Sequence, residues 1–389
     1  MTTRPAPAPR PVSTAGDGRR LAYIDNLRIL LTVLVVLHHC AVTYGNIPAW
    51  YHTEPAQDPT GRALDLLVIL NQAFFMGMFF LISGLFVPGS ADRKGGRRFM
   101  RERLVRLGVP LLLFALFLRP LTTVEIYQEY AADAPYWLFY IFSWDPGPLW
   151  FVETLLVFCL AYVLIRRLRG RRAPEAAGTD RSGATGARPS GAFPGPAAVA
   201  GFTAVLIAAT WAWRIIVPVG SFWPVIGLPT PYFLPQYVLM FAVGVLAYRR
   251  GWFARIPNAA GWSGLAMAAA GCALLPLSID APMQVDPLSL QALVDPVYEG
   301  LFAVGIILSL LWLFQRLFNR QGPFARFLSA NAYAVYFLHA PVLVGIAVLL
   351  SGWQAPALAK FAALGALSLP VCWAAAQALR SLPYAKRVF

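Results

Sequence analysis

Long apolar runs recur along the chain and are separated by short polar segments. Ten of these runs are long enough to cross a membrane as helices, which takes about 20 apolar residues each. They fall near residues 25–44, 64–86, 104–121, 148–165, 197–217, 232–249, 260–277, 297–318, 329–350 and 356–379. The pattern predicts an all-α, polytopic integral membrane protein with about ten transmembrane helices.

Two segments lack this pattern. Residues 1–20 are rich in Pro, Ala and Arg, and residues 170–196 are rich in Gly, Ala, Pro and Arg. Neither segment can bury enough apolar surface to offset the entropy lost on ordering, so both are predicted to be disordered. The rest of residues 21–389 is predicted to form one membrane domain. Its chemistry must therefore lie within the helices or their loops.

Composition and charge agree with this class of protein. The chain is 58% hydrophobic and only 13% charged, and it carries a net charge of +14. Of its 32 Lys and Arg residues, 28 fall on one side of the ten predicted spans, leaving Arg62, Arg119, Arg214 and Lys360 for the other. This is the positive-inside pattern, which predicts that both termini are cytoplasmic. Topology thus explains the basicity, and nucleic acid is excluded as a partner.

Polar residues interrupt the first apolar run. Arg28 and His39 are eleven residues apart. On a helix this spacing returns to within about 20° of the starting direction and rises roughly 16 Å. A cation at the membrane edge therefore lies below an imidazole inside the bilayer. Asp25 and Thr32 share this stripe, whereas His38 points about 100° away and is predicted to contact a neighbouring helix.

His39 is a candidate general base. Intramembrane ionisable residues are costly and usually functional, and a neutral imidazole can take the proton of a hydroxyl group. Two carboxylates are candidates to assist it: Asp25 on the same stripe, and Glu153 in the segment GPLWFVETLL near the outer end of the fourth run. The alternatives are a structural histidine, an Arg28 that only marks the inner side, and a Glu153 that reaches the surface.

A second candidate site surrounds the second loop. Arg103 and Arg106, in RRFMRERLVRLGVP, are three residues apart and share a helix face, where they could clamp phosphate groups. Such runs also act as positive-inside determinants or bind lipid headgroups. In the preceding FFMGMFFLISGLF, Gly77 and Gly84 share a face that allows another helix to approach closely, and Ser83 adds a polar group.

Other features are predicted to be structural. The outer loops at residues 119–147 and 278–296 are acidic, and the first is rich in Tyr and Trp. This suits a sugar partner, but an interfacial aromatic belt is the favoured explanation. Tyr336 and His339 share a helix face, where a structural hydrogen bond is predicted for both. The four cysteines lack the spacing of metal ligands and are predicted to be small core residues, so no metal site is expected.

Several motifs occur in an order that resembles a known family. YIDNLRILLTVLVVLHH resembles an opening Y-x-D-x-x-R followed eleven residues later by His. FFLISGLF resembles an FF-x-x-SG element, RLVRLGVP resembles an RxxR element, and NAYAVYFLHAP resembles a late Y-x-x-Y-x-x-H segment. Together, over residues 21–350, they resemble the membrane-bound acyltransferase-3 family. These are ten-helix bacterial acyltransferases that modify surface glycans, glucans, lipids and antibiotics.

The resemblance implies an O-acyltransferase of the bacterial inner membrane. An acyl group, acetyl first and succinyl second, would pass from cytoplasmic acyl-CoA, as co-substrate rather than bound cofactor, to a hydroxyl of a glycan, lipid or similar acceptor. His39 matches the family's base, while Arg28, Ser83, Arg103 and Arg106 match the elements that would hold acyl-CoA. The expected partners are acyl-CoA, a carbohydrate or lipid-linked acceptor, and membrane lipids.

One departure from the family pattern concerns Glu153. Many relatives carry an LWSLxVE-type sequence, whereas Trp150 and Glu153 are only three residues apart here. The LWF opening looks more like the branch that includes glucan succinyltransferases. The main rival hypothesis is a secondary transporter in which His39 and Glu153 form a proton relay. That rival predicts substrate flux without consumption of acyl-CoA.

Overall fold

The structure is a computed structural model that describes the chain except for residues 1–20, 48–49, 173–190, 224–226, 280–285 and 287. The described residues are mainly helical and form no β-strand. Ten helical segments among them are long and apolar enough to cross a membrane. Each coincides with one of the ten predicted runs, so the predicted all-α, polytopic fold is confirmed.

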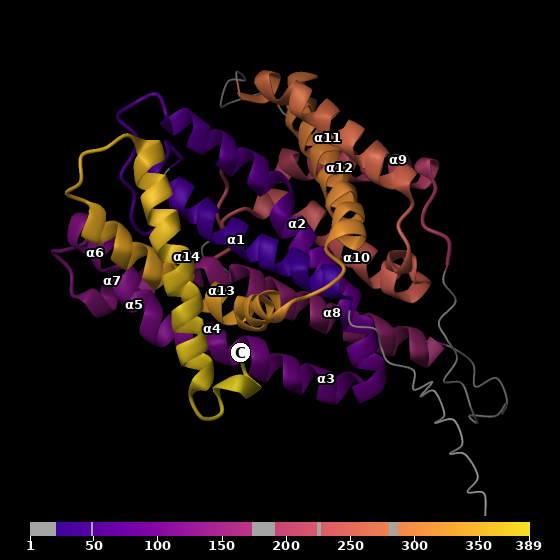
Figure 1. Ribbon diagram of the computed structural model, residues 1–389, viewed down its shortest axis with the longest axis horizontal. Coiled ribbons are helices and arrows are strands. Elements are labelled where there is room, and N and C mark those ends of the chain that lie inside the picture. Colours follow the sequence, from indigo (N-terminus) through magenta and orange to yellow (C-terminus); the bar gives the residue numbers. More distant parts are fainter. Residues whose placement is uncertain (1–20, 48–49, 173–190, 224–226, 280–285, 287) are drawn as a thin grey trace, which may run out of the picture.

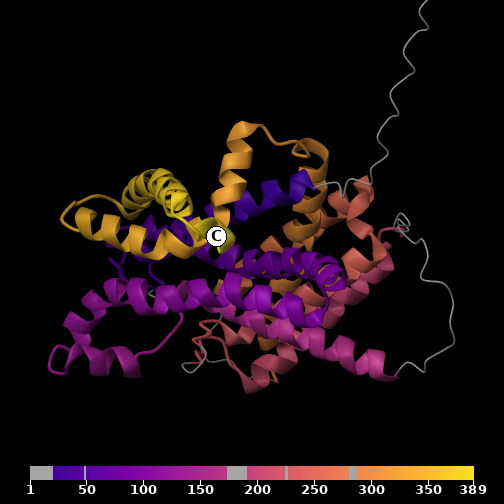
Figure 2. The same ribbon diagram turned by 90° about the horizontal axis from the view of Figure 1, so that it is seen from below.

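Nine of these ten spans contain one long helix each, and the third is built from short pieces. The long helices are α1 (Ala22–Tyr44), α2 (Gly61–Lys94), α8 (Trp150–Arg172), α9 (Pro196–Ile216), α10 (Leu234–Arg250), α11 (Asn258–Ile279), α12 (Val294–Leu317), α13 (Pro323–Leu350) and α14 (Ala357–Ser381). Two further short helices, α6 (Val124–Tyr130) and α7 (Tyr136–Phe142), lie together at one edge of the bundle, far from α9 and α11 (Figures 1 and 2).

The third span, Gly96–Thr122, contains two π-helical turns. The helices α3 (Gly96–Arg103), α4 (Val109–Leu113) and α5 (Arg119–Thr122) are joined by the π turns Leu104–Gly108 and Phe114–Leu118. Pro110 and Pro120 follow the two π turns closely. A proline lacks the N–H that continues an α-helical ladder, and π turns are a common local adjustment to such a disruption.

The first helix lies at the centre of the molecule. It packs against α2, α12, α13 and α14, so it touches both the early and the late part of the chain (Figure 1). Its buried positions recur around most of the helix, as expected for a helix surrounded by other helices. Polar residues on α1 are therefore placed inside the protein rather than against lipid.

Close backbone contact holds α2 against α10. A methyl group at Gly84 would come within 2.2 Å of the carbonyl oxygen of Phe241, and one at Gly244 within 2.0 Å of that of Leu81. Only glycine permits this approach. The predicted packing role of Gly84 is confirmed, and Gly77 likewise faces the Gln236 side chain of α10.

Two other predictions concern the disordered segments and the four cysteines. The predicted disorder of residues 1–20 and of most of 170–196 lies outside the described residues, and α8 continues to Arg172 before that gap. Of the four cysteines, Cys40, Cys159 and Cys372 are buried as predicted, but Cys272 is exposed on α11. That helix lies at the periphery of the bundle, so an apolar position there does not have to face the core (Figure 1).

The bundle has two ends that differ in charge. The basic end carries Arg28, Arg103, Arg106 and Arg380, and the far end carries residues 45–47 and 50–60 and the loop around α6 and α7. The positive-inside prediction places the basic end in the cytoplasm.

Candidate active site

A cavity of about 460 Å³ opens at the basic end of the bundle. Residues from α1, α2, the segmented third span, α8, α13 and the C-terminal region form its wall. All four residues expected to hold acyl-CoA line it together: Arg28, Ser83, Arg103 and Arg106. The structure thus brings into one chamber residues that are separated by up to 78 positions in the sequence.

The charged side chains that line this cavity are all cations. Besides the three arginines that the sequence singled out, Arg380 and Lys386 also line it. Its described lining includes no Asp or Glu, and the carboxylate of Asp25 lies 3.7 Å from the Arg28 guanidinium. Five cations around one chamber make a site for a ligand with several negative charges. The sequence treated Arg380 and Lys386 only as topological charges, because nothing in their spacing places them beside Arg28.

Helix α13 fixes the walls of the cavity. The Tyr333 hydroxyl donates to the carbonyl oxygen of Arg106 at 2.8 Å, and the Tyr336 hydroxyl donates to the carbonyl oxygen of Pro148. These bonds tie α13 to the arginine-bearing segment and to the turn before α8. Both tyrosines also line the cavity. The second bond confirms the structural hydrogen bond that the sequence predicted for Tyr336.

His39 lies deeper in the bundle than the cavity and is not among its lining residues. Because α1 is a continuous helix, His39 is roughly 16 Å along the axis from Arg28 and roughly 10 Å from Thr32, which does line the cavity. Its ring stacks on His339 with 5.2 Å between centroids, and His339 stacks on Tyr336 at 5.7 Å. A row of rings thus leads from the cavity wall to His39.

The three intramembrane histidines differ in their contacts. His339 Nδ1 donates to the carbonyl oxygen of Tyr336 at 2.7 Å, which leaves the buried Nε2 as an acceptor without a partner among the described residues. His39 Nδ1 is likewise buried and unpartnered within the described chain. His38 packs on Phe75 of α2 at 5.0 Å, as the helix arithmetic predicted.

Of the two candidate carboxylates, Asp25 lies far from His39 and Glu153 lies off the cavity-lining face of its helix. Asp25 lies fourteen residues before His39 on α1, roughly 21 Å along the axis, and pairs with Arg28 instead. Glu153 is partly exposed on α8, while Phe151, Val152 and Leu155 of the same helix line the cavity. These three positions define a face from which Glu153 points away by roughly 150°. A catalytic role for either carboxylate stays a prediction.

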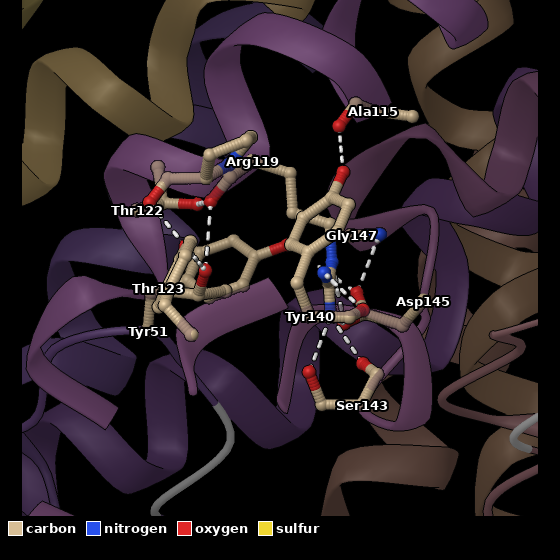
Figure 3. Close-up of polar contacts among 11 residues, drawn as sticks. Tyr51, Ala115, Arg119, Thr122, Thr123, Tyr140, Ser143, Asp145 and Gly147 are labelled. Carbon is tan, nitrogen blue, oxygen red and sulfur yellow. Dashed lines mark hydrogen bonds and ion pairs between the residues drawn. The ribbon is translucent and has the colours of Figure 1, made fainter. Parts of the chain in front are cut away.

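At the far end, a polar network surrounds Arg119 (Figure 3). Its guanidinium is 1% exposed and contacts the Asp145 carboxylate at 3.0 Å, the Ser143 carbonyl and hydroxyl oxygens, and the Tyr140 carbonyl oxygen. Asp145 also accepts from the Gly147 N–H at 2.6 Å. One buried cation thereby ties the end of the third span to the loop that leads into α8.

The segment after α1 is attached to this network. The Tyr51 hydroxyl donates to Asp145 at 3.3 Å, and burial together with the neighbouring Asp145 carboxylate raises the pKa of that hydroxyl well above its ordinary value. The adjacent Trp50 stacks on His39 with 3.8 Å between ring centroids. His52 follows, its Nδ1 2.6 Å from the Glu125 carboxylate of α6. No feature of the sequence indicated Trp50, because nothing in the hydrophobic pattern shows that its side chain points into the bundle.

Much of the acidic and aromatic character of the far end serves internal contacts. Asp145 and Glu125 pair with Arg119 and His52, and the Tyr136 hydroxyl donates to the Pro120 carbonyl oxygen at 2.7 Å. These contacts are internal to the protein, and the interfacial aromatic belt that the sequence favoured stays a prediction.

Comparison with known proteins decides the family. A family model described as an acyltransferase domain, that of the acyltransferase-3 family, matches residues 21–377. The chain belongs to the acyltransferase-3 family. No curated protein and no solved structure gives a significant match. Family membership and the ten apolar helices together identify a multi-pass membrane acyltransferase.

Membership in the acyltransferase-3 family supports a catalytic interpretation of the cavity and of His39. The match covers the segments that carry Arg28, Ser83, Arg103 and Arg106 and the central helix with His39, and it ends at residue 377, before Arg380 and Lys386. The chamber and the imidazole above it are therefore the candidate active site of an acyltransferase. Glu153 does not line this cavity, and a proton relay between His39 and Glu153 stays the rival prediction.

Proposed function

We propose that the protein transfers an acyl group, acetyl in the first instance and succinyl as the alternative, from acyl-CoA to a hydroxyl of a glycan, lipid or similar acceptor. The observation that carries this proposal is the cavity at the basic end, a space of about 460 Å³ whose described lining has five cationic side chains and no Asp or Glu side chain. Coenzyme A carries several phosphate charges at one end and its thioester at the end of a long, uncharged arm.

The cavity suits the phosphate end of such a donor. Arg28, Arg103 and Arg106 come from different elements and face one space, where arginine forks can bind phosphate oxygens in pairs. Arg380 and Lys386 add charge from the C-terminal region. Ser83 contributes a hydroxyl on the wall formed by α2.

The thioester end would extend along α1 towards His39. The roughly 16 Å between Arg28 and His39 is comparable with an extended pantetheine arm. At the far end of that distance, His39 takes the proton of the acceptor hydroxyl as its oxygen attacks the thioester carbonyl carbon. The carbon–sulfur bond then breaks, and the proton passes from His39 to the departing CoA thiolate. The products are the acyl ester and free CoA.

Purified protein given radiolabelled acetyl-CoA or succinyl-CoA and a glycan and lipid extract tests this proposal. Wild type should transfer label to an acceptor, and His39→Ala should lower the rate by a factor of about 100 or more, because general-base catalysis contributes about 10² to 10⁴. The matched control is His38→Phe, which removes the neighbouring imidazole but keeps a ring against Phe75.

The control variant should retain at least half of the wild-type rate. Absence of transfer by wild type with every donor would contradict the proposal. So would a His39→Ala variant that transfers as fast as wild type. Substrate flux into vesicles without consumption of acyl-CoA would favour the transporter hypothesis instead.

A further inference from the structure

The tryptophan above His39 is placed unusually for a loop residue. Trp50 belongs to the segment between α1 and α2 at the far end of the bundle, yet its indole lies almost parallel to the His39 imidazole, with an interplanar angle of 14°. The same indole lies 6.1 Å from the His339 ring. A side chain from the far end therefore reaches the deepest polar group of the candidate active site.

The indole N–H is buried and has no hydrogen-bond partner among the described residues. An indole nitrogen can only donate, and a buried donor without an acceptor lowers stability. Tryptophan is usually placed so that this N–H finds a partner. The position of Trp50 therefore needs a reason other than packing.

The direction of the N–H excludes His39 as its acceptor. An indole N–H points within the plane of its ring, and an imidazole nitrogen accepts within the plane of its own ring. Because the two planes are nearly parallel and the centroids are 3.8 Å apart, the N–H points past the edge of the stack rather than into the imidazole. The N–H is therefore left to donate to a group that lies beside the stack, in the layer next to that of the His39 ring.

The indole is also held firmly. The neighbouring Tyr51 is 8% exposed, and its hydroxyl is bonded to Asp145 of the Arg119 network. Tyr51 and Trp50 also contact each other, with 5.1 Å between ring centroids. A donor fixed in advance, in surroundings poor in water, is the arrangement that stabilises developing negative charge most effectively.

We propose that the indole N–H of Trp50 is an oxyanion donor of this enzyme. This inference rests on the proposed function. When the acceptor oxygen bonds to the thioester carbon and its proton moves to His39, the carbonyl π electrons move onto the carbonyl oxygen. Trp50 donates to that oxygen. When the carbonyl re-forms and the carbon–sulfur bond breaks, the charge leaves the oxygen and the proton on His39 passes to the CoA thiolate.

The variant Trp50→Phe tests the donor directly, since it keeps an aromatic ring over His39 and removes only the N–H. Removing one oxyanion donor lowers kcat by about 10² to 10³ in well-studied enzymes, so a fall of at least about tenfold is expected here. The affinity for acyl-CoA, measured by titration calorimetry, should stay unchanged, because Trp50 does not line the cavity and stacks on His39, which lies roughly 16 Å along α1 from Arg28. Trp262→Phe, on the exposed face of α11, is the matched control and should leave both quantities unchanged.

Three outcomes would overturn the inference. A kcat of Trp50→Phe within twofold of wild type would show that the N–H takes no part in the reaction. A change confined to the KM for the acceptor would place the indole in acceptor binding instead. Failure of wild type itself to consume acyl-CoA would overturn the proposed function, and the role of Trp50 would fall with it.

Discussion

Arginines shape both ends of this molecule, but they do so in opposite ways. At the far end, the Arg119 guanidinium is almost fully buried and donates its hydrogen bonds to Asp145, Ser143 and Tyr140. At the basic end, Arg28, Arg103 and Arg106 face a cavity whose described lining contains no Asp or Glu side chain. The charge of Arg119 is thus balanced by Asp145 within the protein. The three arginines at the basic end instead place like charges around one cavity.

The difference separates a scaffold from a binding site. A buried ion pair with every donor used stabilises one conformation of the chain and offers nothing to a ligand. Clustered cations repel one another until an anion joins them, so their arrangement makes sense when a polyanion binds. The sequence placed Arg119 and Arg106 on opposite sides of the membrane, but it did not show that Arg119 is buried and paired with Asp145.

The largest expected effect is on stability at the far end. Arg119→Met removes the cation and leaves Asp145 and two carbonyl oxygens without their donor, which should lower the free energy of unfolding by about 3 kcal/mol. Thermal unfolding in detergent measures this change. Acyl-CoA affinity of the folded fraction should not change, because Arg119 is remote from the cavity.

Arg62→Met provides the control, since Arg62 is an exposed arginine near the start of α2. It should leave the unfolding temperature close to that of wild type. Equal unfolding temperatures for the two variants would remove the distinction between scaffold and surface arginines at this end.

A smaller effect, on binding, is expected at the basic end. Arg103→Ala and Arg106→Ala should each weaken acyl-CoA affinity by about tenfold, because each removes charge-assisted hydrogen bonds to phosphate. Calorimetric titration with acyl-CoA measures the change, and the unfolding temperature should hardly move. Added salt should weaken wild-type binding more than binding to either variant.

Arg167→Ala is the matched control for these two variants, because Arg167 is exposed at the same end but does not line the cavity. It should bind acyl-CoA as wild type does. Unchanged affinity in both Arg103→Ala and Arg106→Ala would reduce this run to a topological determinant.

The smallest effect is expected at Glu153. Because Glu153 points away from the cavity-lining face of α8, Glu153→Gln should change kcat and acyl-CoA affinity by less than about twofold. Steady-state kinetics measures both. A loss of kcat comparable with that of His39→Ala would instead restore Glu153 as a catalytic carboxylate and would link the far end to the chemistry.

The sequence predicted the architecture and part of the site for identifiable physical reasons. A membrane requires long apolar helices, so all ten spans could be found from hydropathy. Arg28, His38 and His39 lie on one continuous helix, so their relative directions followed from helix geometry. The RxxR pair also faces the cavity, although π turns separate the pieces of its span.

The remaining parts of the site depend on contacts between distant segments. Arg380 and Lys386 meet Arg28 only because α14 packs against α1. Trp50 reaches His39 only because the loop after α1 folds back and is anchored through Tyr51. Neither periodicity nor spacing encodes such contacts. Asp25 shows the converse, since it shares the stripe with His39 but pairs locally with Arg28.

The glycine contact between α2 and α10 has a consequence for the assembly of the chain. Gly84 precedes residues 173–190 in the sequence and Gly244 follows them, and their helices touch backbone to backbone. Association of helices in lipid depends on such close fit rather than on exclusion of water. Two separately synthesised fragments, one ending after α8 and one starting before α9, should therefore find each other in the membrane and reconstitute the bundle. A single bulky side chain at Gly244 should prevent that complementation.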